Sequence, residues 1–243
     1  MFMHWRITFV LILFLCVFIS CSKSTKHEDF EISPWAYEEA KLIALYLSGE
    51  LEAPEDLYNQ VLRELVAIRS TFGGTFEMVN RITFWPPWMV SYLLLAFHDS
   101  TAQQIEAGEY EAWDELNEKY HVSEIKTEGI KHGFVSLVFE GTLNPFRLAE
   151  QYAVLPGARY AEPNYLDGDG PNVYARQTEG EITYLFRYAY GDCMAGCIYS
   201  EYWYFVFEGD RPVFIGHWIP YEDPREPRWW TEAVLNQQLY RGF

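Results

Sequence analysis

The stretch from Glu181 to Phe207 reads EITYLFRYAYGDCMAGCIYSEYWYFVF: two runs of aromatic and β-branched residues on either side of a short turn. Such runs favour strands, and the Gly-rich segment between them favours a turn, so the stretch predicts a β-hairpin. Further strand-like runs lie at Val173 to Arg176 and at Pro212 to Pro220. Residues 171–220 are therefore predicted to form an antiparallel meander of three or four strands.

The two cysteines in this turn, Cys193 and Cys197, are predicted to form a disulfide. Of the four cysteines in the chain, Cys16 lies in the N-terminal leader and Cys21 at its end, so one even pair remains. An even pair in an oxidising compartment is typical of a disulfide, and closing so short a loop would fix the turn rather than clamp the whole fold. A redox pair and a metal site are the alternatives, although redox pairs usually have two intervening residues and zinc needs four ligands.

Residues 1–20 are predicted to be a secretory signal peptide. Arg6 supplies a positive charge, and the run from Ile7 to Ile19 is apolar apart from Thr8. This run is shorter than the stretch of about 20 residues that crosses a membrane as a helix. A transmembrane anchor is the alternative interpretation.

The end of the run, Phe18 to Cys21, resembles the lipobox of bacterial lipoproteins. The resemblance implies that Cys21 carries a lipid and becomes the new N-terminus, which would anchor the protein to the membrane in the bacterial cell envelope, outside the cytoplasm. Ordinary secretion, with Cys21 as a free thiol, is the alternative. The polar residues 21–32 are expected to form a flexible, lipid-anchored tether.

The composition is strongly acidic. The 243 residues carry a net charge of −17, and removal of the leader would leave 17 basic and 35 acidic residues, a net charge of −18. A surface of this charge repels phosphates, so nucleic acid is excluded as a partner. The chain is 49% hydrophobic and 18% aromatic, which is enough for a core of normal size.

Residues 33–80 are predicted to form a helical hairpin. Ser33 and Pro34 supply an N-cap and a first helical residue, and the first helix is expected to run from Trp35 to Leu47. The second helix is expected to start near Pro54, with acidic residues in its first turn. It carries one apolar stripe, which must be buried against the rest of the protein: Leu57, Val61, Leu65 and Ile68.

Residues 84–166 are predicted to form an α+β sandwich. The expected elements are a strand (Met89 to His98), a helix (Thr101 to Tyr120), two strands (Val122 to Glu128 and Lys131 to Glu140), a helix capped by Asn144, and a strand (Ala158 to Glu162). This order is that of the ferredoxin-like, or split βαβ, sandwich, in which both helices cover one sheet face. The other face is left open, and the meander is expected to pack on it or extend the sheet.

The end of this segment, Leu155 to Tyr165 (LPGARYAEPNY), resembles the end of the prodomain of subtilisin-like proteases, as does the helix that starts at Asn144-Pro145. The resemblance in the order of elements covers residues 89–166. In that family the prodomain is a folding chaperone and an inhibitor, so the resemblance implies a protease as a partner. Here, further strands follow in place of a protease domain. The layout with Gly-Asp-Cys-x-x-Gly-Cys is also similar to uncharacterised secreted bacterial proteins.

The candidate binding surface is a group of aromatic residues that could stack on sugars or on peptide side chains: Trp203, Tyr204, Trp218, Trp229 and Trp230. Burial in the core is the alternative for these residues. Asp167 and Asp169 could begin a calcium loop, but an Asp- and Gly-rich turn is the simpler interpretation. The sequence shows no Gly-x-Ser-x-Gly or HExxH motif, so no catalytic residue, metal or cofactor is predicted.

Residues 221–243 are expected to form a loop and a short helix capped by Thr231. Taken together, these features predict a non-enzymatic envelope lipoprotein that binds a protein partner. An inhibitor or chaperone of a secreted subtilisin-like protease is one alternative, and an acidic hydrolase or carbohydrate-binding protein is another.

Overall fold

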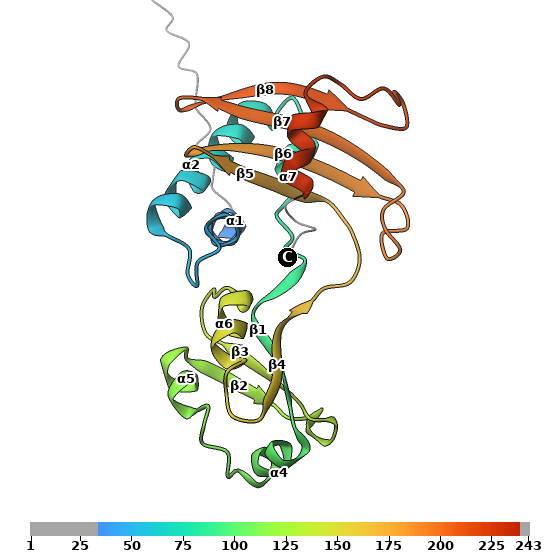
Figure 1. Ribbon diagram of the computed structural model, residues 1–243. Coiled ribbons are helices and arrows are strands. Elements are labelled where there is room, and N and C mark those ends of the chain that lie inside the picture. Colours follow the sequence, from blue (N-terminus) through green and yellow to red (C-terminus); the bar gives the residue numbers. More distant parts are fainter. Residues whose placement is uncertain (1–33, 239–243) are drawn as a thin grey trace, which may run out of the picture. The chain divides into compact units, whose positions relative to one another are not determined.

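The computed structural model describes residues 34–238, and Figure 1 shows how their elements are arranged. The helices are α1 (Pro34–Ser48), α2 (Glu55–Phe72), α3 (Glu77–Arg81), α4 (Asp99–Ala107), α5 (Asp114–Lys119), η1 (Ile130–His132), α6 (Pro145–Tyr152) and α7 (Trp230–Gln238). The strands are β1 (Trp88–Phe97), β2 (Val122–Lys126), β3 (Phe134–Phe139), β4 (Ala158–Tyr165), β5 (Asn172–Thr178), β6 (Glu181–Tyr190), β7 (Tyr199–Glu208) and β8 (Arg211–Trp218). The predicted α+β fold is confirmed. The leader, Cys21, the tether and Ser33 lie outside the described residues.

The N-terminal helices α1 and α2 form the predicted pair. Val61, Leu65 and Ile68 of the apolar stripe are fully buried, and Leu57 packs at the edge of the same core. Glu55 and Asp56 lie in the first turn of α2, where the helix dipole favours negative charge. The short helix α3 follows before the chain enters β1.

A buried ion pair joins the two helices. The Glu39 carboxylate of α1 accepts hydrogen bonds from Arg69 of α2 at 2.6 and 2.9 Å, and both side chains are less than a tenth exposed. The same pair fixes the segment that leads to β1, because Glu39 also accepts from the Phe84 N–H at 2.9 Å and Arg69 donates to the Ile82 carbonyl at 2.8 Å. Two opposite charges therefore hold three pieces of backbone together inside the core.

The sandwich has the predicted topology. Its sheet has the order β2-β3-β1-β4 with every pair antiparallel, which is the split βαβ arrangement. Leu93, Leu95 and Phe97 of β1 point to one face, where they share a core with residues of α4 and α6. Asn144 caps α6 as predicted, since its Oδ1 accepts from the Phe146 N–H at 3.0 Å.

The helix predicted over residues 101–120 is wrong as a single element. The chain forms α4 and α5 instead, because Gly108 takes a left-handed conformation (φ 74°) and ends α4. Trp113 and Tyr120 nevertheless reach the sandwich core, joined there by Tyr110 from the break. The predicted span therefore contributes buried aromatic residues to the core, although two short helices present them in place of one.

The meander is a separate sheet with the order β5-β6-β7-β8. The prediction that it would pack on the open sheet face or extend the sandwich sheet is wrong, because it forms its own sheet and, within the described residues, its core is shared mainly with α1 and α2. Phe72 at the end of α2 lies 5.3 Å, between ring centroids, from Phe205 of β7. On the other face, α7 packs against the sheet, with Trp229 stacked at 5.7 Å on Tyr204 (Figure 1). Since Tyr204 and Phe205 are neighbours in one strand, they point to opposite faces, and both faces are covered.

The helix α7 starts two residues earlier than predicted, since a cap at Thr231 would place its first residue at 232. Trp230 is already helical, so Thr231 lies inside the first turn and is not the N-cap. The buried residue that holds α7 in place is Asn236, which is fully enclosed and donates to the Thr183 carbonyl of β6 at 3.0 Å. A buried amide with a strand carbonyl as its partner fixes the helix position on the sheet.

Candidate functional site

The turn between β6 and β7 contains the disulfide predicted from the sequence. Cys193 and Cys197 are bonded, and their Cα atoms lie 4.0 Å apart. Gly191 has φ 104°, and a Cβ there would lie 3.0 Å from Ile198, so glycine is needed where the chain enters the turn. The bridge closes a local bend and leaves the rest of the sheet unconstrained.

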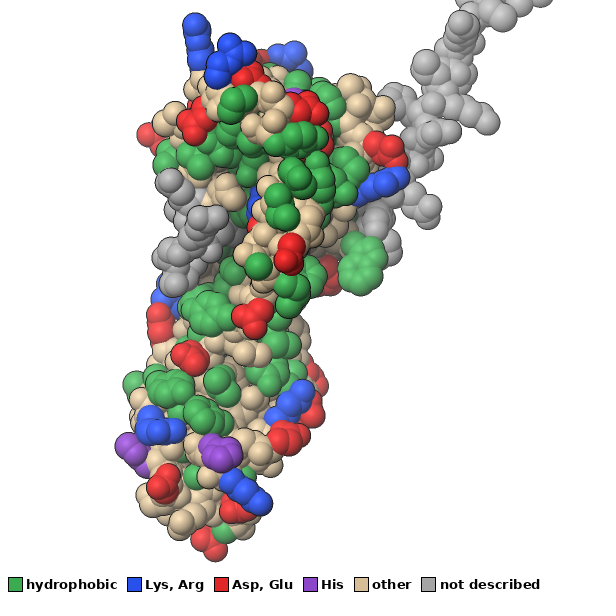
Figure 2. Space-filling view, turned by 90° about the vertical axis from the view of Figure 1, so that its right-hand side faces the viewer, with side chains coloured by type: hydrophobic (Ala, Val, Ile, Leu, Met, Phe, Trp, Pro, Cys, Tyr) green, Lys and Arg blue, Asp and Glu red, His purple; other side chains and the backbone are tan. Residues whose placement is uncertain are grey.

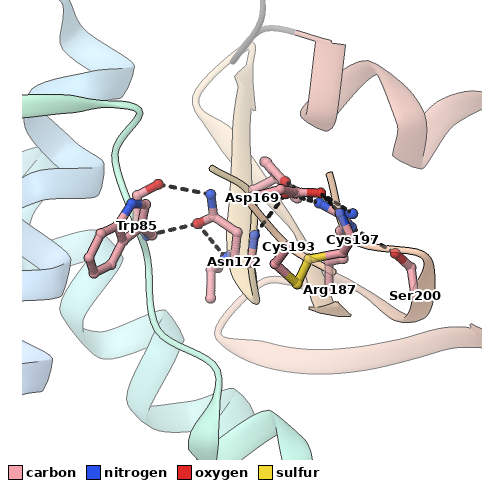
Figure 3. Close-up of polar contacts among 10 residues, drawn as sticks. Trp85, Asp169, Asn172, Arg187, Cys193, Cys197 and Ser200 are labelled. Atoms are coloured by element: carbon pink, nitrogen blue, oxygen red, sulfur yellow. Dashed lines mark hydrogen bonds and ion pairs between the residues drawn. A yellow bond between two sulfur atoms is a disulfide. The ribbon is translucent and has the colours of Figure 1, made fainter. Parts of the chain in front are cut away.

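Asp169 fastens this turn to the body of the protein (Figure 3). Its backbone N–H donates to the Cys193 carbonyl at 2.8 Å, and its carboxylate accepts from the Cys197 N–H at 3.2 Å. The same carboxylate makes a bidentate ion pair with Arg187 of β6, at 2.6 and 2.7 Å. Both ends of the disulfide loop are therefore hydrogen-bonded to Asp169, which lies in the connection between β4 and β5.

Arg187 is buried, and each of its three side-chain nitrogens donates a hydrogen bond. Besides Asp169, it donates to the Ser200 hydroxyl at 3.0 Å and to the Tyr174 hydroxyl at 3.4 Å. Burial alone would lower the pKa of Arg187, but the bonds to Asp169 and Tyr174 outweigh it and raise that pKa. Burial would likewise raise the pKa of Asp169, yet the bonds from Arg187 and from two backbone N–H groups hold it below its ordinary value. Both groups are charged at neutral pH.

This arrangement favours a structural role for the turn. Asp169 is engaged by Arg187, which leaves its carboxylate committed to a protein cation rather than to calcium. Among residues 34–238 there is no group of three or more His, Cys, Asp or Glu side chains that could hold a metal ion. Nothing in the sequence signalled the Asp169–Arg187 pair, because the two residues are 18 positions apart and belong to no local motif.

The residues expected to form an aromatic binding surface are mostly core. Trp203, Tyr204 and Trp230 are 3%, 1% and 9% exposed, and Trp218 and Trp229 are half-buried beside them. Trp229 and Trp230 pack on β7 and β8, with Trp230 4.7 Å from Tyr202 and 4.5 Å from Trp218 between ring centroids. The expectation of an exposed platform made by these five residues is thus corrected: they join α7 and its preceding loop to the sheet.

A different aromatic row lies beside the cysteine turn. Tyr188, Tyr190 and Tyr199 stack in sequence at 5.2 and 5.3 Å, and Tyr221 meets Tyr199 edge-on at 5.3 Å. Tyr199 and Tyr221 are exposed. The sequence of β6 contains a signal for this row, because alternate residues of a strand point to the same face. Tyr188 and Tyr190 lie on the same face as Tyr184 and Phe186 and extend beyond the part of that face covered by helices.

The second uncovered surface is the sheet face of the sandwich opposite its helices, here called the open face. It carries Tyr92, Leu94, Phe134, Val138 and Tyr160, and neither hydrophobic core of the described residues includes them. The register brings them together: Tyr92 lies opposite Val138, and Ala96 lies between Phe134 and Tyr160. In Figure 2, hydrophobic side chains gather over the lower part of the view, where the sandwich lies, with charged side chains around and between them.

No helix in residues 34–238 is long and apolar enough to span a bilayer. Comparison of the chain with protein-family models, with curated proteins and with solved structures found no match. The functional argument therefore depends on the surfaces described above and on the sequence of the leader.

Proposed function

We propose that the protein is a non-enzymatic lipoprotein of the bacterial cell envelope that binds a protein partner. The leader and its terminal Cys21 support the envelope location, since the apolar run, the small residue and the cysteine occur in the order of a lipobox. The disulfide pair is compatible with an oxidising compartment.

The open face is the observation that supports a protein partner. A sheet face with Tyr92, Leu94, Phe134, Val138 and Tyr160 presents adjacent aromatic and aliphatic side chains, which is the composition of the centre of protein interfaces. Lys126 lies 5.7 Å from the Tyr92 ring and Arg159 lies 5.8 Å from the Phe134 ring. Lys126 also pairs with Glu124 at 3.4 Å, and Glu162 lies opposite Leu94, so charges of both signs surround the apolar side chains and can orient a partner surface of mixed charge.

A photo-crosslinking experiment tests this proposal. Benzoyl-phenylalanine in place of Tyr160, in cells that produce the lipidated protein, is expected to give one specific cross-linked partner. Benzoyl-phenylalanine in place of Tyr165 is the matched control, because this exposed tyrosine of the same strand packs against Phe146 instead. Leu94→Lys should abolish the cross-link and leave the thermal midpoint nearly unchanged. A cross-link equally strong from Tyr165, or unaffected by Leu94→Lys, contradicts the proposal.

The envelope anchor has its own test. Labelling with a radioactive fatty acid is expected for the full chain and for Cys193→Ser, and to disappear in Cys21→Ala. Label retained in Cys21→Ala would remove the anchor from the proposal and leave the open face to be judged separately.

Inhibition of a secreted subtilisin-like protease is a second candidate, favoured by the sheet order β2-β3-β1-β4 and by the Leu155 to Tyr165 segment. It predicts that the purified wild-type protein slows such a protease. The Leu94→Lys variant is expected not to slow it. No slowing at micromolar concentrations would exclude it. The third candidate, an acidic hydrolase or carbohydrate-binding protein, predicts a deep cleft with converging carboxylates or a flat row of tryptophans. Trp203 and Trp230, which were expected in such a row, are in the core.

A further inference from the structure

Two tyrosines of the aromatic row beside the cysteine turn contact each other through their hydroxyl groups. Tyr190 is the last residue of β6, and Tyr221 follows the end of β8 by three residues. The Tyr190 hydroxyl donates to the Tyr221 oxygen at 3.5 Å, and the Tyr221 hydroxyl donates to the Glu222 carboxylate at 3.3 Å. The fold therefore brings together two phenols that are 31 positions apart in the chain, with a carboxylate beside them.

The rings of both tyrosines are held in place. Tyr199 lies opposite Tyr190 in the β6–β7 ladder, and their rings stack with centroids 5.3 Å apart. The same Tyr199 ring meets Tyr221 edge-on at 5.3 Å, so it contacts both members of the pair. The segment that presents Tyr221 is fixed as well, because the Asp223 carbonyl accepts from the Trp218 indole N–H at 2.8 Å. A pair that is already positioned in this way loses little further freedom when its members react with each other.

The surroundings of Tyr221 favour its oxidation. The ring is 56% exposed, so an oxidant can reach it from solvent. The hydrogen bond with Tyr190 raises the pKa of Tyr221 to about 12, so this phenol carries its proton at neutral pH. A phenol that loses an electron must also lose that proton, and the Glu222 carboxylate is in position to accept it.

We propose that Tyr190 and Tyr221 are a modification site at which a haem peroxidase, with hydrogen peroxide, forms a dityrosine cross-link. Each phenol loses one electron and one proton to give a phenoxyl radical. A carbon–carbon bond then forms between the two rings, at a carbon next to each hydroxyl-bearing carbon. The hydrogen on each of these carbons moves to the phenolic oxygen, which restores both phenols. The two electrons and two protons released reduce one molecule of peroxide to two molecules of water.

The cross-link would join parts of the fold that the disulfide leaves independent. The disulfide closes only the turn between β6 and β7. The bond between Tyr190 and Tyr221 would enclose β7 and β8, and it would attach the loop that leads to α7 to the end of β6. A link that closes a longer loop restricts the unfolded chain more. The cross-linked protein is therefore expected to unfold at a higher temperature than the untreated protein.

Treatment of the purified full-length protein with a haem peroxidase and hydrogen peroxide tests the proposal. The protein is kept dilute, so that coupling within one chain is favoured over coupling between chains. The expected product is a monomer with dityrosine fluorescence and a raised thermal midpoint. After reduction of the disulfide and digestion at acidic residues, mass spectrometry should find the peptide with Tyr190 joined to the peptide with Tyr221, with the loss of two hydrogen atoms. Cleavage after Glu201 and Glu208 separates the two peptides.

Variants assign the cross-link to this pair. Tyr190→Phe and Tyr221→Phe should each abolish it, and both keep the aromatic ring that packs in the row. Tyr188→Phe is the matched control, because Tyr188 stacks on Tyr190 at 5.2 Å within the same row. Tyr165→Phe is a second control, which removes a phenol that is 52% exposed on another sheet. Both control variants should form the cross-link in the same yield as the wild type.

The proposal is overturned if the monomer forms no dityrosine, if the linked peptides join Tyr190 to Tyr199 instead, or if dityrosine persists in Tyr221→Phe. Loss of the cross-link in Tyr165→Phe would overturn it as well. Circular dichroism of each variant before treatment shows whether it is folded, and the linkage found in the wild type decides the outcome without any variant. Neither the lipid anchor nor the open face is needed for this result, and failure here leaves the proposed function intact.

Discussion

Replacing Arg69 by Met is expected to destabilise the protein by about 3–5 kcal/mol, because removing one member of a buried ion pair leaves the other charge buried and unpaired. The Glu39 carboxylate is 4% exposed and would keep only the Phe84 N–H as a partner. The Ile82 carbonyl would also lose its donor. Against a total stability of about 5–15 kcal/mol for a domain, this is a large fraction.

The double variant Glu39→Leu/Arg69→Met separates charge from packing. It removes both charges, so it should be no less stable than Arg69→Met alone, with a coupling free energy of about 2–3 kcal/mol. Urea unfolding followed by tryptophan fluorescence and far-ultraviolet circular dichroism gives these values. Glu77→Gln, which breaks the exposed Glu77–Arg81 pair, is the control and should cost less than about 1 kcal/mol. A cost below about 1 kcal/mol for Arg69→Met, or strict additivity in the double variant, would refute the reasoning.

Three further perturbations probe the rest of the fold. Replacing either cysteine of the turn by serine should cost about 2 kcal/mol and speed hydrogen exchange only around the turn, since the closed loop is short; faster exchange throughout the sheet would contradict this. The folded-state pKa of Asp169 lies below its ordinary value, so its contribution to stability is present above an unfolded pKa of about 4 and is lost as pH falls through the lower folded value. Asp169→Asn should therefore flatten the decline of the unfolding free energy below about pH 4, and an unchanged slope would count against the pair. Gly157→Ala should destabilise by more than Gly141→Ala, because both positions have φ near 80° but only the first would overlap the Thr101 side chain; equal midpoints in thermal unfolding would exclude that contact.

The sequence was most informative where one local signal determined one local structure. Asn144 before Pro145 predicted the cap of α6, and the spacing of Val61, Leu65 and Ile68 predicted the buried side of α2. The order of elements then led to the sandwich topology, because few arrangements bury both helix stripes on one sheet.

The meander was harder to interpret because its central strands are buried on both faces. In such strands the alternation of exposed and buried residues is lost, and Trp203 and Tyr204 gave no sign of which face was covered. Contacts between distant segments, such as Asp169 with Arg187 and Trp85 with Asn172, depend on the assembled fold and have no local signature. The candidate surfaces could be located only from the structure for the same reason.

The position of α7 has a consequence for biogenesis. Every strand of the sheet that it covers precedes it along the chain, so one aromatic side of β6 and β7 stays bare until the final helix has been made or translocated. A chain that folds from its N-terminus therefore exposes this aromatic surface until α7 forms and covers it. Under the envelope location proposed above, export should depend on a holding chaperone during that interval, and a chain that lacks α7 should be degraded by quality-control proteases.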